Sequence, residues 1–150
     1  ALECLGGAGF IEDSAMPRLY RQAPLNGIWE GSGNVICLDV LRTLQRDALA
    51  GQALRGLLKE AAASDRALAE KVAAIETQLR NPDPAQARLL VEDLALVLQG
   101  KLLRRHSPPA LADAFIATRI ARRGGFAYGT LPAADTGAIL HRAWPPLANG

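Results

Sequence analysis

The 150-residue sequence is poor in the residue types on which several common classes of protein depend. Its two cysteines, Cys4 and Cys37, exclude a scaffold held by several disulfide bonds and predict a reducing, cytoplasmic setting. No apolar run approaches the roughly 20 residues that cross a bilayer. The two histidines, His106 and His141, have no Asp, Glu or Cys at ligand spacing. We therefore expect neither a metal site nor a membrane partner.

Signals for β-strands are almost as scarce. No segment alternates apolar and polar residues over more than a few positions, whereas apolar residues at helical spacing run through most of the chain. The sequence therefore predicts an all-α fold. The spacing predicts helices over about 34–50, 52–62, 64–81, 84–105 and 109–123, with shorter helices near 15–22 and 133–142.

The first residues, ALECL, are typical of a helix end closed by Gly6-Gly7, and no initiator Met precedes them. We therefore expect the sequence to be the C-terminal part of a longer protein. Between residues 8 and 31, Pro17, Pro24 and several glycines predict a long ordered loop. A loop of that length in a compact domain usually serves a function.

One carboxylate in this loop, Glu30, stands between the large aromatic Trp29 and the small residues Gly31-Ser32-Gly33. Glycine lets a backbone come close to a ligand, and an apolar wall raises the pKa of a carboxyl group. Glu30 is therefore a candidate general base. From the spacing alone, a loop carboxylate paired with Arg18 or Arg21 is the simpler interpretation.

The residues that follow are candidates for binding a phosphate or a ribityl chain. Ser32, Gly33 and Asn34 can present a hydroxyl, a backbone amide and a carboxamide. The alternative is that Ser32 or Asn34 only caps the helix that begins here, and the two roles are compatible. Gly6-Gly7 lacks the preceding strand of a dinucleotide-binding fingerprint.

Basic residues gather in the last third of the chain, where seven Lys and Arg stand against two Asp and Glu. Arg119, Arg122 and Arg123 are expected on one face of the fifth helix, just after Arg104 and Arg105. Such a cluster can bind the phosphates of nucleic acid. Apolar residues are expected on the same side and aromatic residues are not interleaved, so a solvated or subunit-interface surface is the favoured alternative.

Taken together, residues 1–42 resemble the C-terminal helical domain of the flavin-dependent acyl-CoA dehydrogenase family. The segments that carry the resemblance are LECLGGAGF (2–10), MPRLYRQAP (16–24) and IWEGSGNVICLDVLR (28–42). More narrowly, EGSGN with CLDVLR, and later SPPALADAF with RRGG, are similar to the alkylation-response (AidB-like) branch of the family. The extended helical C-terminus of that branch matches the hundred residues after position 50.

The resemblance implies a domain organisation and a reaction. Residues 1–50 would be the end of the helical-bundle domain, and residues 51–150 a helical extension with a basic C-terminal part. Glu30 would remove the α-proton of an acyl-CoA thioester while FAD accepts the β-hydride. Its backbone amide would donate to the thioester carbonyl, and Gly31 would leave room for the acyl chain beside Trp29.

The same resemblance implies where the cofactor binds. Ser32 and Asn34 would contact the phosphate or adenine end of FAD, and Gly6-Gly7 would approach the FAD of a neighbouring subunit in a homo-oligomer, a dimer or tetramer. The family commonly has Gln where this chain has Glu3, and Asn34 replaces a longer side chain. The isolated 150 residues are expected to be inactive.

Three functions stay open at this point. The first is α,β-dehydrogenation of a short or branched acyl-CoA. The second follows from the alkylation-response branch, in which dehydrogenase activity is weak and a basic C-terminal surface is linked to the binding and protection of double-stranded DNA. The third is an oligomerisation module with the arginine cluster buried between subunits.

Overall fold

The computed structural model describes residues 1–122, 129–131 and 134–144, and within these ranges it contains helices and no strand. The all-α prediction is therefore confirmed. The helices are α1 (Gly7–Phe10), α2 (Met16–Gln22), α3 (Gly33–Arg46), α4 (Ala48–Ser64), α5 (Arg66–Arg80), α6 (Ala87–His106), α7 (Pro109–Phe115) and α8 (Thr136–Ala143). Shorter turns are η1 (Glu3–Leu5), η2 (Ala23–Gly27), η3 (Pro84–Gln86) and the π-helical η4 (Ile116–Ile120).

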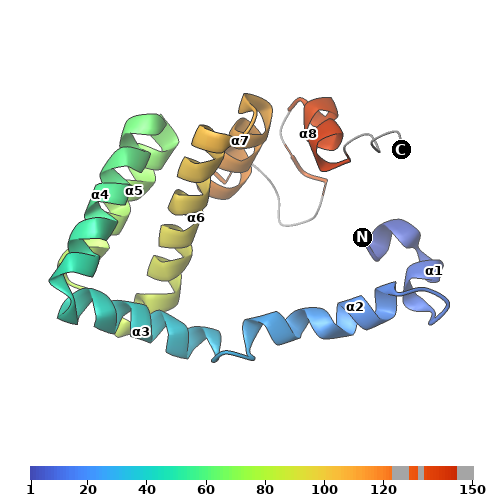
Figure 1. Cartoon of the computed structure of the whole chain (residues 1–150), viewed down its shortest axis with the longest axis horizontal. Coiled ribbons are helices and arrows are strands. Elements are labelled where there is room, and N and C mark those ends of the chain that lie inside the picture. The colour runs from blue at the N-terminus through green and yellow to red at the C-terminus, as the bar shows by residue number, and fades with distance from the viewer. Residues whose placement is uncertain (123–128, 132–133, 145–150) are drawn as a thin grey trace, which may run out of the picture.

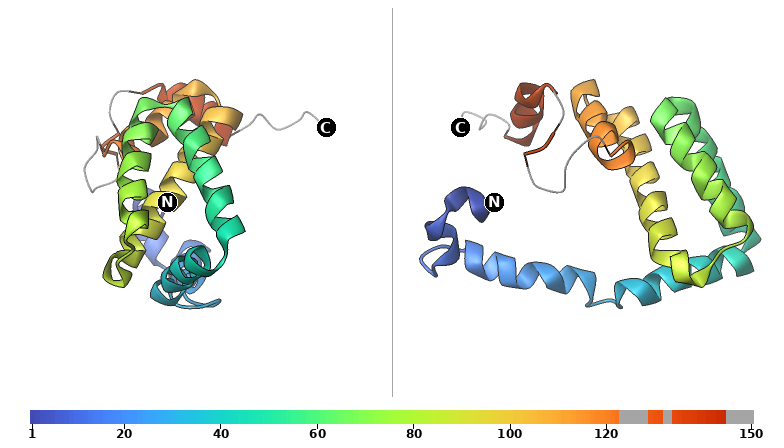
Figure 2. Two further views of the ribbon diagram at one scale, coloured as in Figure 1. Left: turned by 90° about the vertical axis from the view of Figure 1, so that its left-hand side faces the viewer. Right: turned by 180° about the vertical axis from the view of Figure 1, so that it is seen from behind.

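The chain has a bundle and an arm (Figure 1). In the bundle, α4, α5, α6 and α7 lie side by side, and α3 runs across one end of them. The arm, residues 1–32, continues away from α3, and its short helices pack mainly on one another. The view from behind shows the same separation (Figure 2, right). None of the helices in the described part is long and apolar enough to cross a membrane.

Aspartate side chains set the starts of two bundle helices. Asp65 accepts hydrogen bonds from the backbone N–H groups of Ala67 and Leu68, which confirms the helix start predicted at this point. Asp47 accepts likewise from Leu49 and Ala50. The prediction of one helix over 34–50 was wrong, because the extended backbone of Asp47 ends α3 and starts α4.

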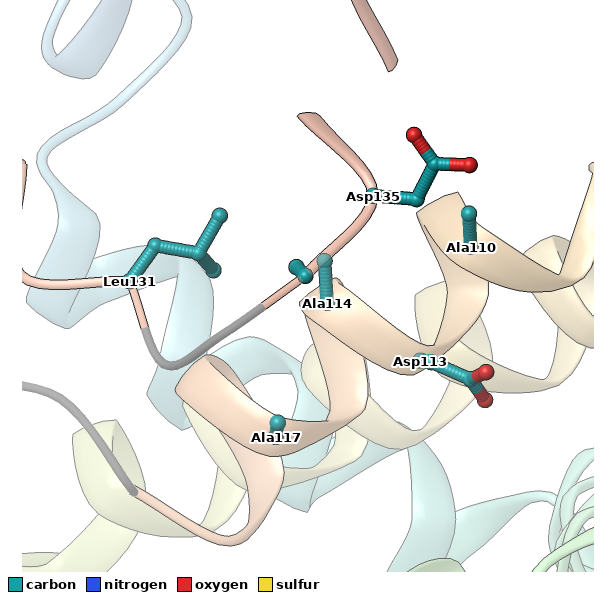
Figure 3. A pocket seen from close by; sticks show the side chains of 7 residues that line it. Ala110, Asp113, Ala114, Ala117, Leu131 and Asp135 are labelled. Atoms are coloured by element: carbon teal, nitrogen blue, oxygen red, sulfur yellow. The ribbon is translucent and has the colours of Figure 1, made fainter. Parts of the chain in front are cut away.

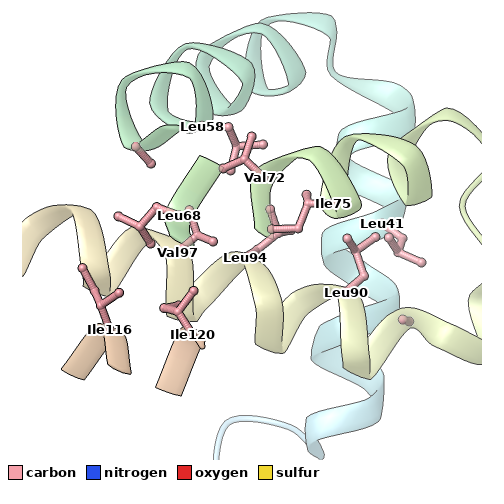
Figure 4. Close-up of a cluster of buried hydrophobic side chains, with 12 residues drawn as sticks. Leu41, Leu58, Leu68, Val72, Ile75, Leu90, Leu94, Val97, Ile116 and Ile120 are labelled. Atoms are coloured by element: carbon pink, nitrogen blue, oxygen red, sulfur yellow. The ribbon is translucent and has the colours of Figure 1, made fainter. Parts of the chain in front are cut away.

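The core is organised around α6, whose buried residues Leu90, Leu94 and Val97 face three other helices (Figure 4). The full buried cluster comprises Leu41, Leu58, Ala61, Leu68, Val72, Ile75, Ala87, Leu90, Leu94, Val97, Ile116 and Ile120. Leu41 of α3 is the first of these along the chain, so α3 shares one core with α4–α6 and η4. Position 50, where we expected the domains to divide, lies inside α4.

Close approach of α6 to its neighbours depends on Gly100. A Cβ atom at this position would lie 2.9 Å from Cδ2 of Leu68, a buried side chain of α5. Beside the core, Lys71 of α5 donates to Asp93 of α6 over 2.9 Å, and the Asp93 side chain is only 5% exposed. This ion pair satisfies a carboxylate that would otherwise be costly to bury.

Shortening a core side chain should destabilise the bundle. Leu68 is fully buried, so we expect Leu68→Ala to lower the free energy of unfolding by about 2–5 kcal/mol, because it removes transfer free energy and leaves a cavity. Urea denaturation followed by circular dichroism measures the change. The matched control is Leu49→Ala in α4, whose side chain is exposed, and which should change stability by about 0.5 kcal/mol or less. Equal effects of the two substitutions would contradict this core.

Candidate functional site

Glu30 lies in the short connection between η2 and α3, which joins the arm to the bundle. The residue is exposed, and so is its neighbour Trp29, which is 64% accessible to solvent. Arg21, one of the two arginines considered as a partner, donates instead to both carboxylate oxygens of Glu12. Within the described residues, the Glu30 carboxylate has no ion pair and no hydrogen bond.

The backbone after Glu30 has the geometry of a close-approach site. Gly31 has φ +133, a region that side chains rarely allow, so glycine is required here. Ser32 then occupies the N-cap position of α3 with extended backbone, but its hydroxyl makes no capping hydrogen bond. The structure therefore does not support a capping role for the Ser32 side chain. In the described part of the chain, the first backbone amides of α3 and the Asn34 side chain have no hydrogen-bond partner.

Arg88, in the first turn of α6, lies beside the start of α3, a neighbour that the sequence did not predict. A Cβ atom added to Gly33 would lie 3.6 Å from Nη2 of Arg88 and 3.7 Å from Nη1, so the guanidinium stands beside the start of α3. The buried neighbours Ala87 and Leu90 anchor this turn of α6. No local pattern signals the contact, because the packing of α6 on α3 alone brings residues 33 and 88 together.

The glycine pair lies at the far end of the arm. Gly6 has φ +56, and a Cβ atom at Gly6 or Gly7 would have no atom within 4 Å. Their backbone is therefore open to an approaching molecule. Gly9 differs, since its Cβ atom would lie 2.5 Å from the carbonyl oxygen of Leu2, and only glycine fits that turn.

Exposed apolar side chains are concentrated along the arm and the first turn of α3. They are Leu5, Phe10, Ile11, Leu19, Tyr20, Leu25, Ile28, Trp29, Val35 and Ile36. Single exposed apolar residues are ordinary, but so many in 36 residues mark a surface that contacts another part of a protein. Glu30 lies within this surface.

The arginine cluster is divided by the structure. Arg104 donates to Asp65 through Nη2 at 2.6 Å and Nε at 3.2 Å, and it also pairs with Asp113. Its guanidinium therefore joins α5, α6 and α7 and is engaged within the bundle. By contrast, Arg105 is exposed and has no ion pair among the described residues.

The predicted arginine face of the fifth helix was wrong in its geometry. The helix passes into the π-turn η4 and ends at Ile120, and Arg122 follows it with φ +50. Arg119 and Arg122 are both exposed and unpaired in the described part, but they do not share a helical face. Arg123 lies outside the described residues.

A hollow of about 380 Å³ lies between α7–η4 and residues Leu131, Ala134 and Asp135 (Figure 3). Alanine side chains, including Ala114, line one side and Leu131 the other. Both of its carboxylates have structural roles, since Asp113 pairs with Arg104 and Asp135 caps α8 by accepting from Ala138. Within the described ranges no group of three or more His, Cys, Asp or Glu is placed to hold a metal ion.

The Asp65 carboxyl group has a shifted pKa. Burial by itself raises the pKa of Asp65, but hydrogen bonds from Arg104 and from the amides of Ala67 and Leu68 outweigh burial, so the pKa lies below its ordinary value. Only 15% of the side chain is exposed, so solvent screens these interactions weakly. Protonation of Asp65 should therefore lower the free energy of unfolding of the bundle.

The arm and most of α3 match a known protein family. Residues 1–45, from η1 to nearly the end of α3, match the family model of the acyl-CoA dehydrogenase C-terminal domain. This match confirms the family resemblance on the segment that contains Glu30 and the glycine pair.

Two curated relatives specify the resemblance further. The chain is 39% identical over 125 residues to the putative acyl-CoA dehydrogenase AidB of Escherichia coli (strain K12), an alignment that covers 83% of this chain and 23% of the relative. It is 36% identical over 104 residues to acyl-CoA dehydrogenase family member 11 of Caenorhabditis elegans, covering 67% of this chain and 16% of the relative. The chain thus spans less than a quarter of either relative.

The contribution of Asp65 to the stability of the bundle should decrease as the pH is lowered. Because its pKa is lowered on folding, its stabilising contribution is complete above the unfolded value of about 3.9 and is lost as pH falls through the folded pKa. We expect Asp65→Asn to cost about 1–3 kcal/mol at pH 7, measured by urea denaturation, and progressively less below about pH 4. The control is Asp13→Asn, which removes an exposed carboxylate. A cost of Asp65→Asn that does not change between pH 7 and pH 2.5 would contradict the assignment.

Proposed function

We propose that this chain is the C-terminal part of an FAD-dependent acyl-CoA dehydrogenase, with Glu30 as the base that removes the α-proton of the acyl-CoA. The position of Glu30 is the observation that supports the proposal. Within the described residues it is an unpaired carboxylate, followed by the positive-φ backbone of Gly31 and the start of α3, inside the segment that matches the family. An abstracting base needs a carboxylate that is free of a permanent cation partner.

The chemistry divides between the chain and its cofactor. The α C–H bond breaks with its proton passing to a carboxylate oxygen of Glu30, and a carbon–carbon double bond forms. The hydride that leaves the β-carbon would pass to FAD when that cofactor is bound. The backbone N–H of Glu30, which has no acceptor in the described part, would donate to the thioester carbonyl. Trp29 would form one apolar wall beside the acyl chain.

The donor groups at the start of α3 suit the phosphate end of FAD. The Ser32 hydroxyl, the Asn34 carboxamide and the first amides of α3, which have no partner in the described part of the chain, are neutral donors of the kind that binds phosphate. We propose that Ser32 and Asn34 hold this part of the cofactor, and that the open Gly6-Gly7 backbone approaches the FAD of a second subunit in a homo-oligomer. We place the protein in the cytoplasm.

The rest of the site would come from outside the 150 residues. Glu30 and Trp29 are exposed in this chain, whereas a base for carbon acids works best when water is excluded. The apolar surface of the arm is the area on which further polypeptide would close over them. The chain alone is therefore proposed to be inactive.

Replacing the proposed base should stop the chemistry without releasing the cofactor. In the full-length protein we expect Glu30→Gln to slow anaerobic reduction of bound FAD by an acyl-CoA by about 10²–10⁴-fold, because the amide cannot accept the proton. The bleaching of the flavin absorption band during titration with isovaleryl-CoA measures the rate, and the FAD content should stay unchanged.

The matched control is Glu76→Gln, which alters an exposed carboxylate on α5 and should reduce normally. A Glu30→Gln enzyme that reduces its flavin at the rate of the unmodified protein would disprove the role of Glu30. Flavin that fails to bleach in the unmodified protein would direct attention to another substrate or to the second function below.

The second candidate function is binding of double-stranded DNA, as in the alkylation-response branch that the chain resembles. The supporting observation is that Arg105, Arg119 and Arg122 are exposed and without ion pairs within the described ranges. Arg122 also keeps a left-handed backbone that a non-glycine residue adopts at a cost. Arg104 is excluded from this surface because its guanidinium is engaged, and Arg123 remains a candidate from the sequence.

Removing these charges should weaken DNA binding and its salt dependence. For Arg105, Arg119 and Arg122 together replaced by Ala, we expect the slope of log affinity against log salt to fall by about two to three, because each phosphate contact contributes about 0.9. The measurement is a salt series of duplex titrations with the full-length protein.

A control triple of other exposed basic residues, Arg46, Lys59 and Arg80 to Ala, keeps the total charge change equal. Equal slopes for the two triples would indicate general charge attraction and not a binding surface. Sedimentation of the same variants tests the third function, since splitting of the oligomer by the arginine triple would identify a subunit interface.

A further inference from the structure

We draw no further inference here: the strongest candidate, the exposed apolar surface that runs along the arm and continues over Ile36 into the groove on α3, adjoins the Glu30 site already described, and nothing in the structure shows what covers it.

Discussion

Burial of the apolar stripe of α6 is the constraint on which the rest of this structure depends. Leu90, Leu94 and Val97 pack against α3, α4, α5 and η4, so one helix provides the contact surface for nearly the whole bundle. The absence of a side chain at Gly100 allows the approach, and the Lys71–Asp93 ion pair fixes α5 against α6 at its edge. Because α6 is held this firmly, its first turn has a defined position beside the start of α3.

The arm differs from the bundle in how its apolar side chains are placed. It contributes no residue to the buried core, and it exposes a row of large apolar side chains around Trp29 and Glu30. Apolar side chains gathered on one surface in this way are typical of an interaction site, and the chain spans 23% and 16% of the two curated relatives described above. The connection between the arm and the bundle presents the Glu30 carboxylate and the first amides of α3, none of which has a partner in the described part of the chain.

The arginines of α6 differ in their partners and in their exposure. Arg104 is engaged by Asp65 and Asp113 and connects three helices, whereas Arg105, the next residue, faces solvent. Arg88 has no such carboxylate partner in the part of the chain that the structure describes. Burial and partners separate a structural arginine from one available to a ligand, and neither can be read from charge counts along a sequence.

Local patterns in the sequence determined the all-α class, the start of α5 at Asp65 and its end near Asn81-Pro82. They also identified the segment around Glu30 that matches the family model. All of these features depend on residues that are neighbours along the chain. The sequence misplaced the break at Asp47 and extended the last bundle helix past Ile120, because apolar periodicity continues across a single extended residue or a π-turn. Only the tertiary structure decided that Arg104 is engaged and that Arg88 stands beside Gly33. Both facts arise from contacts between helices distant in sequence, which no local pattern encodes.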